Sequence, residues 1–205
     1  RIEYSYYLMA VDAGLQMMPS RLLEGEQTAH FLTERFDRQN GKKVHIQTLA
    51  AMNPSADSYE ALFEAACRIG VPPGELRQLF RSMVLNVLGG NVDDHNKNFS
   101  FLMDDDGHWH VAPAYDYTFS VDPDAPYYVN RHSMTINNRT EGITAADLLE
   151  VARRYGIKAA EPFIEKAIGI VSHYPEYGRE AGVGEEWIGT IEKEIAARVE
   201  CVRAD

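Results

Sequence analysis

Three oxygen-bearing side chains stand at spacings that suit a site for a metal ion and a phosphate. Asp93 and Asn98 have four residues between them, and Asp116 follows after a mostly apolar stretch. Magnesium prefers hard oxygen ligands, which the Asn98 amide and the Asp116 carboxylate can supply. In phosphoryl transfer a further carboxylate, here that of Asp93, orients the acceptor hydroxyl and accepts its proton. The three residues therefore predict a magnesium–phosphate site.

The elements around these residues are expected to bring them together. Residues 76–88 predict a central, buried helix, because apolar side chains cover more than one of its faces, and Gly90 ends it just before the polar loop. Residues 99–103 and 108–111 flank an Asp-Gly turn and predict a hairpin. A hairpin reverses the chain, so we expect Asp116 to return to the polar loop.

Two other interpretations of this stretch stay open. Acids and amides beside glycines are ordinary in solvated loops, so the spacing of Asp93 and Asn98 alone is a weak signal. Alternatively, a hydrolase could bind zinc or manganese through the histidines and acids of the region. Its candidate ligands are His95, His108, His110, Asp93, Asp94 and Asp116.

The composition is that of a soluble globular protein, with 45% hydrophobic and 25% charged residues among 205. No stretch is apolar enough to span a membrane, and the N-terminus does not resemble a signal peptide. A net charge of −11 without a basic cluster argues against direct nucleic-acid binding. Cys67 and Cys201 favour free thiols in a reducing cytoplasm, although a disulfide between them stays open. Because the chain lacks an initial methionine, we expect a fragment or a trimmed product.

The remaining sequence predicts a mostly helical fold with two small hairpins. A helix over residues 2–11 is closed by a glycine, and strands over 21–24 and 28–36 flank a polar turn. Thr144, three residues before an aspartate, predicts a capping box at the start of a helix. The other predicted elements are a short helix over 45–51, a helix over 58–69, a loop over 121–128 and helices over 144–155, 159–173 and 185–201.

Several stretches together resemble the HipA family of bacterial toxin serine/threonine kinases. The stretch DDHNKNFSFL (93–102) is similar to the family's D-G-H-x-K-N-F-S pattern, and WHVAPAYD (109–116) to its A-P-x-Y-D segment, which replaces the usual kinase D-F-G. EYSYYLMAVDAGL (3–15) resembles the first helix of the family, with Glu3 at its start, and ERFDR (34–38) resembles the hinge between kinase lobes. Residues 132–157 are similar to its M-S-I-N…D-L-L segment, so the resemblance covers nearly the whole chain in the same order.

The resemblance implies a single domain over residues 1–205, a mostly α-helical, kinase-like large lobe with small β-hairpins. Residues 1–40 would hold the first helix and the hinge, and residues 41–205 the helical lobe. Family members carry a glycine-rich segment and an ATP-gripping lysine before the first helix. We therefore expect the small lobe to be largely absent here, and the chain to be inactive without that upstream region.

The resemblance also implies roles for individual residues of the polar loop. Asp93 would be the catalytic aspartate at the acceptor hydroxyl. His95 and Lys97 would support the loop and the phosphates, and Asn98 and Asp116 would hold magnesium.

At the hinge, the backbone of Glu34 and Phe36 would contact the adenine of ATP, and Asp37 would lie near the ribose. One residue of the loop departs from the family pattern, because Asp94 stands where the family has glycine. We expect Asp94 either to contact the metal or to point to solvent, with Lys97 as its surface partner.

The reaction implied is transfer of the ATP γ-phosphate to a serine or threonine hydroxyl of a protein, with magnesium as cofactor. Family analogy adds a translation factor, such as an aminoacyl-tRNA synthetase, as substrate and a DNA-binding antitoxin as partner. The alternative is a non-catalytic, kinase-like module that binds a partner protein. The intact set of Asp93, Asn98 and Asp116 favours the kinase.

Overall fold

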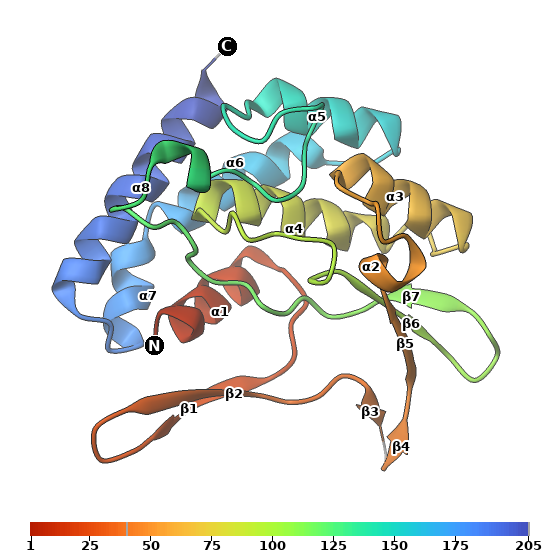
Figure 1. Ribbon diagram of the computed structural model, residues 1–205, viewed down its shortest axis with the longest axis horizontal. Helices are drawn as coiled ribbons and strands as arrows, with labels where there is room; N and C mark the ends of the chain where they lie inside the picture. Colours follow the sequence, from red (N-terminus) through yellow and green to blue (C-terminus); the bar gives the residue numbers. More distant parts are fainter. Residues whose placement is uncertain (40, 205) are drawn as a thin grey trace.

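The computed structural model describes residues 1–39 and 41–204 and shows a body of helices with small strands gathered along one side (Figure 1). The helices are α1 (Ile2–Ala13), α2 (Leu49–Met52), α3 (Tyr59–Arg68), α4 (Leu76–Gly89), the 3-10 helix η1 (Tyr127–Val129), α5 (Ala145–Arg154), α6 (Ala160–Val171), α7 (Tyr174–Glu180) and α8 (Glu185–Arg203). The strands are β1 (Ser20–Glu24), β2 (Ala29–Thr33), β3 (Arg38–Gln39), β4 (Lys42–Lys43), β5 (His45–Thr48), β6 (Ser100–Met103) and β7 (Trp109–Val111).

Helix α4 runs through the middle of the helical body (Figure 1) and packs against α3, α6 and α8. Leu79 and Met83 lie one turn apart on one side of the helix and Leu85 lies on another side, and all three are buried. A helix that is apolar around most of its circumference must be covered on several sides, as predicted. It ends at Gly90, whose φ of 69° is left-handed and whose N–H donates to the carbonyl oxygen of Asn86. The polar loop therefore starts from a fixed point in the core.

The predicted hairpin of β6 and β7 forms, and β5 joins it as a third antiparallel strand, with Ile46 opposite Leu102. The predicted helix over residues 45–51 is therefore wrong for its first half. The chain turns into α2 only after Thr48, whose hydroxyl accepts a hydrogen bond from the N–H of Ala51. Such a short apolar run cannot distinguish strand from helix, and pairing with β6 decides the outcome.

The first hairpin is shorter than predicted. β1 and β2 pair antiparallel around the polar turn, with Leu22 opposite Phe31. The predicted strand over 28–36 is wrong at its end, because β2 stops at Thr33 and residues 34–37 form an irregular turn. Residues 34–37 of the hinge thus lie outside any sheet ladder, whereas Arg38 pairs with Lys43 of β4.

The C-terminal half contains the predicted helices, with boundaries shifted by a few residues, and one more. Thr144 and Asp147 form the predicted capping box at α5. Helix α7 was not predicted, because Pro175 and Gly178 interrupt the helical signal within seven residues. Gly178 is needed there, since a Cβ atom on it would lie 2.9 Å from Ile188 of α8. The predicted loop over 121–128 forms, apart from the short turn η1 at its end.

Two further expectations concern the chain as a whole. Among the helices described, none combines the length and the apolar character that crossing a bilayer requires. Cys67 and Cys201 carry free thiols, as the cysteine count favoured.

Candidate functional site

Asp93 and Asn98 lie on one short loop that follows α4. The Asp93 side chain is 67% exposed, and its backbone N–H donates to Ser120 Oγ at 3.0 Å. Asn98 Nδ2 donates to the carbonyl oxygen of Asp93 at 3.0 Å, which closes the loop on itself. The amide nitrogen of Asn98 is used in this hydrogen bond within the loop. The amide oxygen therefore remains available to coordinate a metal ion.

Asp116 is exposed and has a φ of 56°, in the left-handed region that residues other than glycine rarely occupy. Its carbonyl oxygen accepts a hydrogen bond from Asn91 Nδ2 at 3.5 Å. Such backbone conformations persist only where the surroundings enforce them, and they are common at functional sites. The unusual turn directs the chain after the hairpin back along the polar loop.

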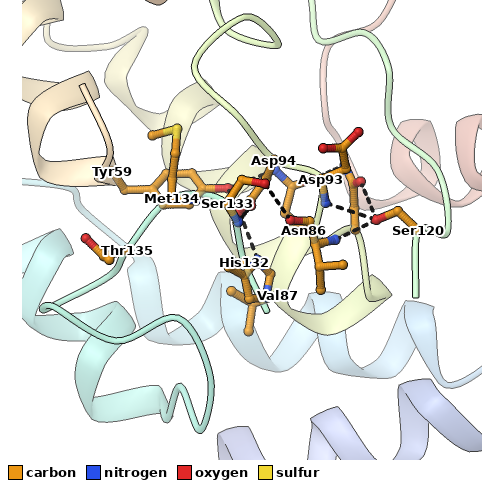
Figure 2. Close-up of polar contacts among 12 residues, drawn as sticks. Tyr59, Asn86, Val87, Asp93, Asp94, Ser120, His132, Ser133, Met134 and Thr135 are labelled. Carbon is orange, nitrogen blue, oxygen red and sulfur yellow. Dashed lines mark hydrogen bonds and ion pairs between the residues drawn. The ribbon is translucent and has the colours of Figure 1, made fainter. Parts of the chain in front are cut away.

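Ser120 joins this returning segment to the loop, as Figure 2 shows beside Asp93. Its Oγ accepts the N–H of Val92 at 2.7 Å and that of Asp93 at 3.0 Å, and it donates to Asn91 Oδ1 at 3.2 Å. The segment that carries Asp116 is therefore bound to the loop that carries Asp93. The structure brings the two predicted acids to the same region of the molecule.

Tyr115 connects the hinge to the same region. Its ring lies 5.5 Å from the ring of Phe36, measured between centroids. Its hydroxyl donates to the carbonyl oxygen of Lys97 at 2.7 Å and lies 2.6 Å from Ser100 Oγ. Burial raises the pKa of Tyr115, and the negative charge of Asp116 adds to that effect. One side chain thus contacts the hinge, the polar loop and the start of β6.

The electrostatics of the site favour a cation. Burial raises the pKa of Glu3 on α1, and the negative charge of Asp116 raises it further. In the described part of the chain no basic side chain forms an ion pair with Asp116, and His95 Nε2, 3.9 Å from Asp93 Oδ1, is the basic group recorded near Asp93. The Asp116 carboxylate and the Asn98 amide oxygen have no basic partner among the described residues, and oxygen atoms of this kind are the ligands that magnesium prefers.

At the hinge, the backbone of Glu34 and Phe36 has the groups that adenine needs. The N–H of Glu34 donates to the carbonyl oxygen of Pro19 at 3.1 Å. The carbonyl of Glu34 and the N–H of Phe36 have no hydrogen-bond partner within residues 1–39 and 41–204. An acceptor and a donor two residues apart match the donor and acceptor on one edge of adenine.

Asp37 is less available than predicted. Arg35 donates to its two carboxylate oxygens at 2.8 and 2.7 Å, and Arg38 approaches one of them at 2.6 Å. The hydrogen bond from Arg35 is the main reason that the pKa of Asp37 is lowered. A ribose hydroxyl would have to share this carboxylate with two arginines.

His95 and Lys97 have different surroundings. His95 Nδ1 is buried and has no hydrogen-bond partner among the described residues. The side chain of Lys97 is exposed, and its backbone carbonyl is held by Tyr115. Lys97 is therefore placed on a fixed backbone with a free side chain, as a mobile phosphate contact requires.

Both expectations for Asp94 are wrong. The residue is 0% exposed, so it neither points to solvent nor pairs with Lys97 at the surface. Both of its carboxylate oxygens accept hydrogen bonds from groups inside the protein, among them Tyr59 and His132, so neither oxygen is left for a metal. Local sequence could not show this, because the partners lie 35 or more residues away.

The arrangement does not support the zinc or manganese hydrolase. The described residues contain one group of three potential ligands, Asp104, Asp106 and His108, exposed at the tip of the β6–β7 hairpin. His110 instead lies within hydrogen-bond distance of Glu75 and Asp104. His95 belongs neither to the group at the hairpin tip nor to these contacts of His110. The candidate histidines are thus divided between the hairpin tip and the polar loop.

Sequence reasoning gave no role to Asn91, Tyr115 or Ser120, which hold the site together. Tyr115 lies within the quoted APAYD segment, but nothing local shows that its ring reaches the hinge. A weak signal existed for Asn86, a polar residue on an otherwise apolar helix, which bonds to Asn91 at 3.0 Å. A buried amide on such a helix needs partners, and these lead to the loop.

Comparisons with known proteins agree with this geometry. The sequence profile of the HipA-like C-terminal domain matches residues 1–176. The protein Y4mE of Sinorhizobium fredii, provisionally named a kinase, is 25% identical over 129 residues, which cover 55% of this chain and 30% of that protein.

Two solved structures share the fold. HipA of Shewanella oneidensis MR-1, determined with HipB and operator DNA, has a TM-score of 0.72 at 20% identity and covers 98% of this chain and 55% of its own. The Helicobacter pylori proinflammatory kinase CtkA has a TM-score of 0.65 at 15% identity and covers 98% of this chain and 82% of its own. The chain thus spans about half of that HipA and less of Y4mE. The predicted kinase-like large lobe is confirmed, and the chain belongs to the HipA-like C-terminal domain family.

Proposed function

We propose that this chain is the large lobe of an ATP- and magnesium-dependent kinase that phosphorylates serine or threonine hydroxyls of a protein. The contacts of Tyr115 carry the proposal, because this residue joins the hinge to the loop of Asp93 and Asn98, one residue before Asp116. A nucleotide held at the hinge would therefore have its phosphates directed toward the exposed acids.

Five residues of the site have specific roles in this proposal. The carbonyl of Glu34 and the N–H of Phe36 bind adenine. The amide oxygen of Asn98 and the carboxylate of Asp116 hold magnesium, which when bound neutralises charge on the phosphates. The backbone N–H and carbonyl of Asp93 are both held by hydrogen bonds, and its side chain is exposed. Its carboxylate orients the acceptor hydroxyl and accepts the proton of that hydroxyl.

The partners follow from the family by analogy. The Shewanella HipA was solved with HipB and operator DNA, and we propose that a protein of the antitoxin class binds the full-length form of this chain as well. The substrate would be a protein, and a translation factor is the first class to test. With a net charge of −11, this chain is not expected to contact nucleic acid itself.

The test uses the full-length encoded protein, because the chain spans only part of its relatives. We expect Asp93→Asn to bind a non-hydrolysable ATP analogue normally but to lose phosphate transfer by about 1,000-fold or more. Asp116→Ala should lose both transfer and magnesium-dependent analogue binding. The measurements are calorimetric titration with and without magnesium, and transfer of radiolabelled phosphate to a protein acceptor.

Asp105→Asn is the matched control, since Asp105 is an exposed acid in the turn of the β6–β7 hairpin. It should behave as the wild type in both measurements. Full activity of Asp93→Asn would refute the role of that residue. Absence of analogue binding by the full-length wild type would favour the non-catalytic binding module.

A further inference from the structure

Asp94 follows the proposed catalytic aspartate and is fully buried. Its Oδ1 accepts the backbone N–H groups of Ser133 at 2.8 Å and Met134 at 3.4 Å. Its Oδ2 accepts the hydroxyl of Tyr59 at 2.7 Å and lies 2.9 Å from His132 Nδ1. Figure 2 shows these groups converging on Asp94. The buried carboxylate is satisfied only while all four partners stay in place.

These hydrogen bonds join the polar loop to two separate parts of the helical body. Tyr59 is the first residue of α3, and its hydroxyl also accepts a hydrogen bond from Asn86 Nδ2 of α4 at 2.9 Å. His132 belongs to the segment that precedes α5. The side chain of Asp94 is therefore fixed by α3, by α4 through Asn86, and by residues 132–134. Asp93, one residue earlier, takes its position from the same anchor.

His132 is itself held from the other side. It is 4% exposed, and its Nε2 lies 3.4 Å from Nη1 of Arg198 on α8. A guanidinium can only donate, so Nε2 accepts and Nδ1 carries the hydrogen that is donated to Asp94. Arg198 in turn forms an ion pair with Glu194 at 2.8 Å. The contacts define one tautomer and one ring orientation for His132.

Asp94 is not a requirement of the family pattern, in which glycine stands at this position. A glycine would leave the N–H groups of Ser133 and Met134 without this acceptor, and His132 without its partner. Burying a carboxylate costs free energy that its hydrogen bonds must recover, so such a residue is weak evidence for stability alone. It does fix the geometry of the groups that it joins.

We propose that Asp94 and His132 are positioning residues, which hold the polar loop so that the Asp93 carboxylate faces the acceptor hydroxyl. This inference rests on the proposed kinase function. Asp94 acts through the loop backbone and touches neither nucleotide nor acceptor, and His132 acts through Asp94. Loss of the hydrogen bond between Asp94 and His132 therefore lowers the turnover number and leaves the nucleotide affinity at the hinge unchanged.

The test compares three variants in the full-length protein. Asp94→Asn replaces an acceptor oxygen by a donor. His132→Gln places its amide near the former Nε2 and removes the donor to Asp94, whereas His132→Asn places a donor at the former Nδ1. We expect the first two to lower kcat by about 10- to 100-fold with unchanged affinity for the ATP analogue. His132→Asn should retain most of the activity, because the hydrogen bond to Asp94 is kept.

Ile164→Val, a small change in the buried face of α6, is the control for a general loss of stability. All rates are divided by the folded fraction, taken from thermal melts of each variant. Unchanged kcat in Asp94→Asn and His132→Gln would overturn the inference, and so would equal losses in His132→Gln and His132→Asn. A wild type without phosphate transfer would instead refute the proposed function, with Asp93→Asn as the reference for an inactive site.

Discussion

The two polar atoms of the Asn98 amide have different roles. Its nitrogen closes the loop onto the carbonyl of Asp93 at 3.0 Å, and its oxygen stays available to a ligand. The sequence predicted a ligand at this position from residue type and spacing. It could not show that the same side chain also shapes the loop, because that role depends on the folded backbone.

Residue types predicted which acids lie at the site, but they did not predict which acid is buried by contacts far along the chain. Asp93 and Asp116 were predicted to be near each other, and the hydrogen bonds of Ser120 and Asn91 bring their segments together. Asp94, the neighbour of Asp93, was expected at the surface and is buried. Adjacent acids look alike in a sequence, and the hydrogen bonds of Asp94 with Tyr59 and residues 132–134 distinguish it from Asp93.

Glu3 gives a prediction at the residue scale. Burial and the charge of Asp116 raise its pKa in the folded protein, so the ionised form is disfavoured there. The resulting loss of stability grows as the pH rises from the unfolded pKa through the folded one. Glu3→Gln should therefore raise the Tm at neutral pH, and this gain should vanish below about pH 4, where the carboxyl is protonated in both states. Thermal melts across this pH range measure the effect.

Glu26→Gln is the control for this effect, since Glu26 is exposed in the turn of the first hairpin. Its Tm should follow that of the wild type at every pH. A gain from Glu3→Gln that is the same at acidic and neutral pH would contradict the electrostatic explanation.

At the scale of elements, the long periodic segments were predictable and the short ones were not. Helices α3, α4 and α8 have enough turns for their apolar patterns to be read, and the capping box of α5 marks its start. Strand β5 was expected to be helical, because four residues carry too little periodicity and the partner strand lies far along the chain. Helix α7 is short, and its proline and glycine interrupt the helical pattern of the sequence.

The end of α4 gives a prediction at the element scale. Gly90 has a left-handed φ of 69°, and a Cβ atom there would lie 3.3 Å from Arg198 Nε and from Phe119. Gly90→Ala should lower the free energy of unfolding by about 1–2 kcal/mol through backbone strain alone. Denaturant titration measures the change. Because the polar loop starts here, phosphate transfer by the full-length protein should fall as well.

Gly74→Ala is the matched control, because a Cβ atom on Gly74 would meet nothing within 4 Å. It should leave both stability and transfer close to those of the wild type. If Gly90→Ala were equally silent, the end of α4 would not constrain the loop.

The molecule as a whole combines a well-packed helical body with small sheets of two or three strands. Two-stranded sheets are marginally stable without further cover, and Leu23 on β1 is 48% exposed. The resemblance predicted this large lobe, and its helical body is what hydrophobic periodicity specifies best.

The difference in length gives a prediction at this scale. The 205-residue chain should fold by itself but bind an ATP analogue at least about tenfold more weakly than the full-length protein, because nucleotides in kinases are enclosed by two lobes. Calorimetric titration of both proteins with magnesium present compares the affinities. Equal affinities would show that the hinge and the large lobe suffice.

Tyr115 has a consequence for how ligands communicate. Its ring contacts Phe36 where the nucleotide base would bind, and its hydroxyl restrains the loop that would receive the acceptor. Thermodynamic linkage then requires reciprocity: if an occupied hinge tightens acceptor binding by some factor, a bound acceptor tightens nucleotide binding by the same factor. A single phenol ring would make the two substrates cooperative.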